Sequence, residues 1–232
     1  MKQSTLSIII PVYNEKATVL SLVEKVKAVK IHGLKKEIIV IDDGSTDGTR
    51  DVLKKMNQVK VFFHPENKGK GAAIQTGLKH ACGDIFLIQD ADLEYNPEEY
   101  EKLLHPILLG NAQVVYGSRF SQGKLFEKNM YYSHCLGNMG LTFMTNLLYA
   151  SNLQDMETGY KVLKKEALAG IELKSERFEI EPEITAKILK KGIPIHQVPI
   201  TFDPRGFEQG KKINWRDGIV ALWTLVKYKF RD

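Results

Sequence analysis

The chain has 232 residues, of which 43% are hydrophobic and 26% are charged, and its formal net charge is +5. This composition is typical of a soluble globular protein and excludes an intrinsically disordered one, and the length suits one sizeable domain spanning residues 1–232. The mild positive charge does not indicate a nucleic-acid partner, and it is compatible with anionic substrates or an anionic membrane surface.

The first half of the sequence alternates strand-like and helix-like segments. Short apolar runs predict strands over residues 6–11, 37–41, 59–63, 85–89 and 114–116, and amphipathic stretches predict helices over residues 16–30, 45–56, 70–80 and 97–109. Repeated strand-helix units with nearly continuous apolar strands form parallel sheets that are covered on both faces. The predicted fold class is therefore α/β.

The second half is less regular. A long helix is predicted over residues 129–149, followed by a strand over 158–163, a helix over 182–191, a strand-like segment over 193–202, a polar loop over 203–214 and a final helix over 215–230. No apolar run approaches the roughly 20 residues needed to cross a bilayer, and no signal peptide is visible. Cys82 and Cys135 have no metal-ligand spacing, so we expect reduced thiols in or near the core and a cytoplasmic protein.

Polar residues follow every predicted strand of the first half. They occupy residues 11–15, 42–45, 64–71, 90–92 and 117–119, and most of these segments carry charge. In an open α/β sheet, ligands bind beyond the carboxyl ends of the strands. We therefore expect these five loops to converge on one ligand site.

The sharpest of these segments is Asp90-Ala91-Asp92-Leu93-Glu94. Two carboxylates one residue apart at a strand end repel each other unless a cation lies between them. Mg²⁺ and Mn²⁺ prefer such oxygen ligands and keep positions open for substrate phosphates. The alternative interpretation is a solvated acidic turn that precedes the helix starting near Pro97.

Two common phosphate-binding signatures are absent from the sequence. The run Gly69-Lys70-Gly71-Ala72-Ala73-Ile74 lacks the last glycine of GxGxxG, and no GxxxxGK[ST] occurs. Neither a dinucleotide-binding site nor a P-loop is therefore indicated. Lys68, Lys70 and the adjacent helix start are still suited to attract a diphosphate, although the glycines are equally explained by helix-entry geometry.

Taken together, residues 8–15 (IIIPVYNE), 42–49 (DDGSTDGT), 67–71 (NKGKG) and 90–93 (DADL) resemble family-2 glycosyltransferases with the GT-A fold. The resemblance is strongest to dolichyl- and polyprenyl-phosphate sugar transferases of the dolichol-phosphate mannose synthase type, and it runs from Ser7 to about Asn214. It implies a Rossmann-like, mostly parallel sheet flanked by helices.

The resemblance also implies roles for individual residues. The matching positions are Pro11, Tyr13, Glu15, Ile41, Asp42 and Asp43 for the nucleoside, with Asp43 on the base, Asp90 and Ala91 for the donor ribose and diphosphate, Asp92 and Glu94 for the metal, Arg119 for a phosphate, and Arg205 and Lys211 for the donor or acceptor phosphate. Asp155 matches the family's acceptor-side carboxylate, as a base or an orienting group, and Glu181 matches a family segment without an assigned role.

The implied reaction is a single displacement with inversion, in which Mg²⁺ or Mn²⁺ and basic residues neutralise the leaving nucleoside diphosphate. The expected donor is GDP-mannose or UDP-glucose, and the expected acceptor is a polyprenyl or dolichyl phosphate. One alternative keeps this donor chemistry with a saccharide hydroxyl acceptor, as in cell-surface polysaccharide synthesis. A second alternative is a non-catalytic protein that binds nucleotide sugars.

The last predicted helix carries a possible membrane contact. Ile219, Leu222, Trp223, Val226 and Phe230 form a stripe at helical spacing, and Lys227, Lys229 and Arg231 flank its end. Such a helix lies at an anionic membrane surface or packs its stripe on the protein itself. We expect any membrane contact to be peripheral or to depend on a membrane-anchored partner protein.

Overall fold

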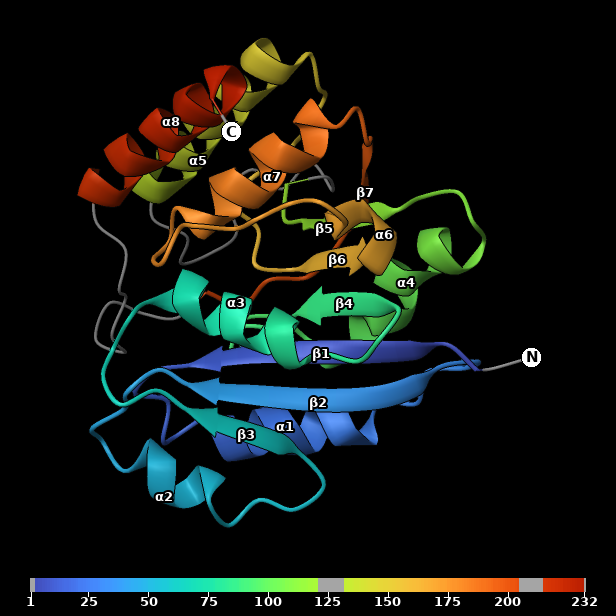
Figure 1. Cartoon of the computed structure of the whole chain (residues 1–232), viewed down its shortest axis with the longest axis vertical. Coiled ribbons are helices and arrows are strands. Elements are labelled where there is room, and N and C mark those ends of the chain that lie inside the picture. Colours follow the sequence, from blue (N-terminus) through green and yellow to red (C-terminus); the bar gives the residue numbers. More distant parts are fainter. Residues whose placement is uncertain (1–2, 121–131, 205–214, 232) are drawn as a thin grey trace.

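A seven-stranded sheet with the order β3-β2-β1-β4-β6-β5-β7 forms the centre of the computed structural model, in which residues 3–120, 132–204 and 215–231 are described (Figure 1). Its strands are β1 (Thr5–Val12), β2 (Lys35–Asp42), β3 (Lys60–Phe63), β4 (Ile85–Ile88), β5 (Val114–Ser118), β6 (Lys161–Lys164) and β7 (Ile195–Pro199). All pairings are parallel except those of β6, which runs antiparallel to both β4 and β5. The predicted α/β class with a mostly parallel sheet is confirmed.

Helices cover both faces of the sheet because its strands are apolar on both sides. In β1, Ile8 and Ile10 pack in one core with α1 (Val19–Ala28), α2 (Thr49–Leu53) and α4 (Tyr100–Leu108). Ile9 points to the other face, where α3 (Lys70–His80) and α7 (Ile180–Lys190) lie. Alternate side chains of a strand point to opposite faces, so a run of three isoleucines supplies both cores.

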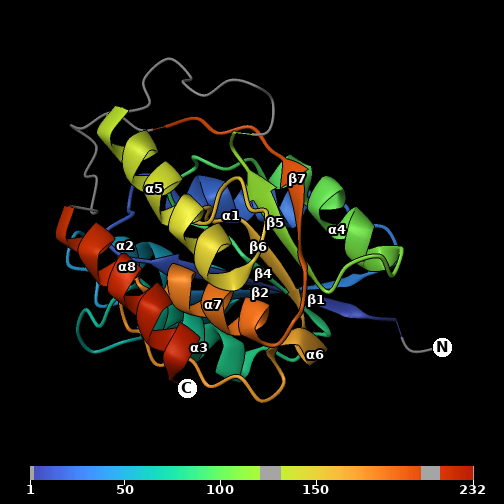
Figure 2. The same ribbon diagram turned by 90° about the horizontal axis from the view of Figure 1, so that it is seen from above.

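An outer helical layer lies over α7. It consists of α5 (Tyr132–Tyr149) and α8 (Trp215–Phe230), which pack against each other and against α7 (Figures 1 and 2). Met156, Ala186, Leu225 and Tyr228 form the buried cluster between them. None of the helices in the described parts of the chain is long and apolar enough to span a membrane.

Several predicted boundaries were wrong. The helix predicted over residues 97–109 begins as a 3₁₀ turn, η1 (Pro97–Glu99), and ends at Leu108, and the helix predicted to reach Met56 ends at Leu53. A short helix, α6 (Lys165–Leu168), was not predicted. Cys135 is buried as expected, but Cys82 is exposed, because it follows the C-terminal end of α3.

The parallel arrangement places the ends of β1 to β5 at one edge of the sheet. β6 joins the sheet in the opposite direction between β4 and β5, so these two strands keep the same direction although they are not neighbours. The five polar loops that follow these strands therefore start from a common edge, as the sequence predicted.

Candidate active site

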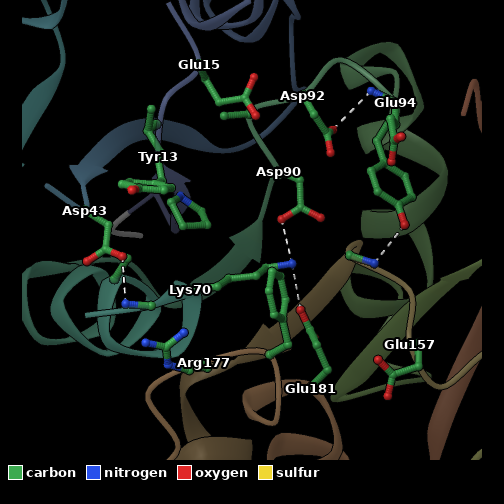
Figure 3. Close-up of a pocket in the computed structure, with 18 of the residues that line it drawn as sticks. Tyr13, Glu15, Asp43, Lys70, Asp90, Asp92, Glu94, Glu157, Arg177 and Glu181 are labelled. Atoms are coloured by element: carbon green, nitrogen blue, oxygen red, sulfur yellow. Dashed lines mark hydrogen bonds and ion pairs between the residues drawn. The ribbon is translucent and has the colours of Figure 1, made fainter. Parts of the chain in front are cut away.

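A pocket of about 340 Å³ lies at this edge of the sheet (Figure 3). Residues from the ends of β1, β2, β4 and β5 and from the start of α3 form part of its wall, and segments of the second half of the chain complete it. The lining residues are Pro11, Val12, Tyr13, Glu15, Asp43, Asn67, Gly69, Lys70, Ala73, Asp90, Ala91, Asp92, Glu94, Tyr95, Arg119, Glu157, Gly159, Arg177, Phe178 and Glu181.

Asp43, at the end of β2, fixes the loop that leads into α3. Its carboxylate accepts hydrogen bonds from His64 Nδ1 at 2.7 Å, Asn67 Nδ2 at 2.9 Å, the Lys68 amide at 3.0 Å and the Gly69 amide at 2.7 Å. A buried carboxylate with several donors is held in one orientation. Asp43 therefore shapes the pocket wall.

The glycines of this loop allow a close approach of two backbones. A Cβ atom on Gly69 would lie 2.4 Å from the carbonyl oxygen of Glu176, and one on Gly71 would lie 2.2 Å from that of Ser175. Gly69 also has a φ of +108°, a conformation that favours glycine. The start of α3 thus packs on the protein's own backbone, which places Arg177 at the pocket.

A chain of alternating charges crosses the floor of the pocket. Lys70 Nζ lies 2.7 Å from Asp90 Oδ1 and 2.8 Å from Glu181 Oε1 (Figure 3). The buried Lys161, which is not among the lining residues, lies 2.5 Å from Glu181 Oε2. Burial opposes each charge, but the partners outweigh it: Asp90 and Glu181 raise the pKa of Lys70, and Lys161 and Lys70 lower the pKa of Glu181. Lys70 and Glu181 are therefore both ionised at neutral pH.

Arg119, after β5, is held by Asp155. Its Nε and Nη2 atoms each lie 2.7 Å from a different oxygen of Asp155, and its backbone amide donates to the same carboxylate at 3.1 Å. Asn138 Nδ2 donates a further hydrogen bond at 2.7 Å. Burial works against ionisation of Asp155, but Arg119 outweighs it and lowers the pKa of the carboxyl.

This arrangement bears on the two roles that the family resemblance leaves open for Asp155, a base or an orienting group. Asp155 is fully buried, is not among the residues that line the pocket, and has both oxygens engaged. A general base must reach the proton that it accepts. The structure therefore does not support Asp155 as a base, and it makes Asp155 the group that positions Arg119.

Asp92 and Glu94 lie together on another part of the wall. The Glu94 amide donates to Asp92 Oδ1 at 3.2 Å, and Leu93 between them has a φ of +64°, which is rare for a residue with a branched side chain (Figure 3). Within the described residues, no group of three or more His, Cys, Asp or Glu side chains is placed to hold a metal ion. Mg²⁺ is commonly held by one or two carboxylates together with substrate phosphates, so this donor pair fits a metal that is shared with a diphosphate.

The comparison with known proteins identifies the family. The family model described as glycosyl transferase family 2 matches residues 7–171, which is more than half of the chain. The chain belongs to glycosyltransferase family 2. The family resemblance predicted from the strand-end motifs is therefore confirmed.

Two curated relatives of this glycosyltransferase act on dolichyl phosphate according to their names. The UDP-N-acetylglucosamine–dolichyl-phosphate N-acetylglucosaminyltransferase of Methanococcus voltae is 30% identical, over 99% of this chain and 98% of the relative. The dolichol-phosphate mannosyltransferase of Pyrococcus furiosus is 32% identical over 88% of this chain, but the match spans only 58% of that protein.

Solved structures support the GT-A fold of this glycosyltransferase. Glucosyl-3-phosphoglycerate synthase from Mycobacterium tuberculosis, crystallised with Mg²⁺ and UDP, has a TM-score of 0.74 at 23% identity and covers 99% of this chain and 80% of its own. The same enzyme with Mn²⁺, UDP and glucosyl-3-phosphoglycerate has a TM-score of 0.70 at 22% identity, with 99% and 81% covered.

Most of the site residues predicted from the sequence of this glycosyltransferase meet in the pocket: Pro11, Tyr13, Glu15, Asp43, Lys70, Asp90, Ala91, Asp92, Glu94 and Arg119. Ile41 and Asp42 are buried outside its lining, and Asp42 Oδ2 pairs with Arg50 Nε at 2.7 Å. Neither residue is therefore part of the pocket lining. Arg205 and Lys211 lie outside the described residues.

Sequence reasoning did not place several pocket residues of the glycosyltransferase. Tyr95, Glu157, Arg177 and Phe178 all line the pocket, as does Glu181, to which no role was assigned. Tyr95, Glu157, Arg177 and Phe178 lie in connecting segments and Glu181 lies at the start of α7, and their spacing in the sequence predicts no common location. The only sequence signal was the likeness of residues 154–161 and 178–183 to family segments.

Proposed function

We propose that this glycosyltransferase transfers a hexose, mannose or glucose, from a nucleotide sugar to a polyprenyl or dolichyl phosphate, with inversion and with Mg²⁺ or Mn²⁺. One observation carries the proposal. A single pocket contains both the carboxylates of Asp92 and Glu94 and the cation of Arg119. The carboxylates suit the metal ion that a donor diphosphate needs, and the cation suits a phosphate acceptor.

On the donor side, Asp92 and Glu94 would hold the metal, and Tyr13 and the wall fixed by Asp43 would contact the nucleoside. The metal, when bound, neutralises the charge that develops on the leaving nucleoside diphosphate. The UDP, Mg²⁺ and Mn²⁺ named in the structures of similar fold support this assignment.

On the acceptor side, the state of Asp155 favours a phosphate. A sugar hydroxyl needs a general base, whereas a lipid phosphate is already anionic at neutral pH and needs a fixed cation. Both oxygens of Asp155 are hydrogen bonded, chiefly to Arg119, so the pair supplies a cation in a fixed position and not a base. The names of the two relatives that act on dolichyl phosphate support the same acceptor class.

The outer helices offer a surface for reaching a lipid. On α8, Trp223 is 65% exposed and Phe230 76% exposed, and on α5, Phe143 and Leu147 are 66% and 67% exposed. The predicted stripe on α8 therefore does not pack on the described parts of the protein, apart from the partly buried Val226. Lys227, Lys229 and Arg231 are exposed on the same helix end. We propose that this apolar and basic surface lies at an anionic membrane.

The two alternatives remain distinguishable by experiment. A saccharide hydroxyl acceptor requires a base in the pocket, and a non-catalytic protein would bind nucleotide sugars without turnover. A screen of radiolabelled GDP-mannose and UDP-glucose, with Mg²⁺ or Mn²⁺, against a polyprenyl phosphate extract and against saccharides tests all three.

We expect lipid-linked product that requires the metal and disappears in Asp92→Ala, while Asp51→Ala, on the exposed surface of α2, retains activity. Product on saccharides alone would favour the hydroxyl acceptor. Wild-type turnover by Asp92→Ala would refute the metal assignment, and binding of a nucleotide sugar without any product would favour the non-catalytic protein.

A further inference from the structure

Glu157 is a pocket carboxyl group that the ion pairs of the site leave out. Around it, Arg119 pairs with Asp155, Lys70 pairs with both Asp90 and Glu181, and Lys161 pairs with Glu181, so three cations are matched by three carboxylates. No ion pair involves Glu157 within the described residues, and its buried Oε1 has no hydrogen-bond partner there.

The surroundings of Glu157 disfavour its charged form. Burial is the largest effect, and the negative charge of Glu181 on α7 adds to it; Lys161 on β6 and Arg119 after β5 oppose them, and the pKa of Glu157 rises to about 7. The neighbouring carboxylate of Asp155 acts in the same direction as burial. At neutral pH, a large fraction of Glu157 is therefore a carboxylic acid, which both donates and accepts hydrogen bonds.

Oε1 is closed off from solvent, so a ligand in the pocket would meet the rest of the Glu157 carboxyl group, which lines the pocket and takes part in no ion pair of the described residues. A phosphate is a poor partner here, because its negative charge would lie close to Glu181 as well as to Glu157. A hydroxyl group is a good partner, because it carries no charge and can both accept a hydrogen bond from the carboxylic acid and donate one to it. Under the proposed function, the acceptor is a phosphate, so the hydroxyl belongs to the donor sugar.

We propose that Glu157 is a sugar-recognition residue, whose carboxyl group, in the pocket wall and outside every ion pair of the described residues, hydrogen bonds to a hydroxyl group of the hexose that is transferred. This inference rests on the proposed function for the identity of the donor. It assigns to Glu157 the binding of the sugar, whereas the nucleoside and the diphosphate are bound elsewhere in the pocket. Figure 3 shows Glu157 and Glu181 in the part of the pocket wall that the second half of the chain supplies.

The test compares a nucleotide sugar with the same nucleotide without its sugar. Isothermal titration calorimetry in the presence of Mg²⁺ measures the affinities of UDP-glucose and UDP, and of GDP-mannose and GDP, for wild type, Glu157→Ala and Glu157→Gln. We expect Glu157→Ala to bind the nucleotide sugar about three- to tenfold more weakly, as for the loss of one hydrogen bond, and to bind the nucleoside diphosphate unchanged.

Glu157→Gln keeps a donor, an acceptor and the size of the side chain, so it should bind the nucleotide sugar nearly as wild type does at pH 6.5. Above pH 7.5 the wild type should lose affinity as Glu157 ionises, whereas the glutamine variant should not. Glu101→Gln, an exposed carboxylate on α4 outside the pocket, controls for the general effect of losing one negative charge.

Three outcomes overturn the inference in different ways. An equal loss of affinity for the nucleotide and the nucleotide sugar in Glu157→Ala would mean that Glu157 supports the pocket without contacting the sugar, and the proposed function would stand. Unchanged binding by Glu157→Gln with a loss of more than 10²-fold in kcat would make Glu157 a general base and favour the hydroxyl acceptor. No binding of any nucleotide by wild type would refute the proposed function, and the inference with it.

Discussion

Replacing Asp155 by alanine should destabilise the protein strongly, because it leaves the largely buried guanidinium of Arg119 without its partner. Asp155 receives two hydrogen bonds from the guanidinium of Arg119, both 2.7 Å long, and two more from the Arg119 amide and Asn138. Breaking a buried ion pair from one side costs about 3–5 kcal/mol. Since folded proteins are stable by about 5–15 kcal/mol, the variant should fold with little stability to spare.

The assay is urea unfolding of wild type, Asp155→Ala, Arg119→Met and the double variant at pH 7. The losses in free energy of unfolding caused by the two single substitutions should not add, because Asp155 contributes little to stability once its partner Arg119 is removed. We expect a coupling free energy of about 1–3 kcal/mol between the two residues. Asp51→Ala, whose carboxylate is exposed and 3.7 Å from Lys54, should leave the urea midpoint unchanged.

The pH dependence has a definite sign. The pKa of Asp155 is lowered in the folded state, so the unfolded chain takes up the proton first as the pH falls. The stabilisation is therefore fully present above the ordinary aspartate pKa of about 4 and is lost as the pH falls below it. Additive losses in the cycle, or a stability difference between wild type and Asp155→Ala that does not shrink in acid, would refute the role assigned to this pair.

Three further predictions use other parts of the molecule. Gly77→Ala places a Cβ atom 2.4 Å from a side-chain carbon of Ile9, so thermal unfolding should show a loss of about 1–3 kcal/mol, whereas Gly140→Ala, with open space around it in α5, should stabilise by up to about 1 kcal/mol. Because the pKa of Glu157 is raised from 4.5 to about 7, there is no penalty for burying its charge in acid, and that penalty grows as the pH rises from 4.5 to about 7; urea unfolding of Glu157→Gln should show a gain of about 1–3 kcal/mol at pH 8 and none at pH 4. In co-sedimentation with anionic vesicles, Trp223→Ala should bind more weakly than wild type, and Leu20→Ala, an exposed apolar residue on α1, should bind normally; equal binding by both variants would contradict a membrane role for α8.

The sequence determined the layers of the fold because the pattern of apolar residues is a local property. The isoleucines of β1 are contiguous, so they could only serve a strand that is buried on both faces. The position of the pocket followed from the same pattern, since parallel strands end at one edge and the polar segments follow the strands. Element ends were less predictable: α2 stops at Leu53 although its apolar pattern continues.

The roles of individual charged residues were decided by tertiary contacts. The sequence presents Asp155 and Glu157 two positions apart, each as a polar residue in a connecting segment. In the folded chain, Asp155 pairs with Arg119, which follows β5, and is a buried anion. Burial and the charge of Glu181 on α7 raise the pKa of Glu157 and favour its neutral acid.

The carboxylates therefore divide into two kinds. Asp92 and Glu94 are separated by one residue in the segment that follows β4, so the sequence alone places them together. For Asp155 and Glu157, the partners lie tens of residues away in sequence. Burial and the charge of such partners set the protonation state and orientation of a carboxylate, and both exist only once the chain has folded.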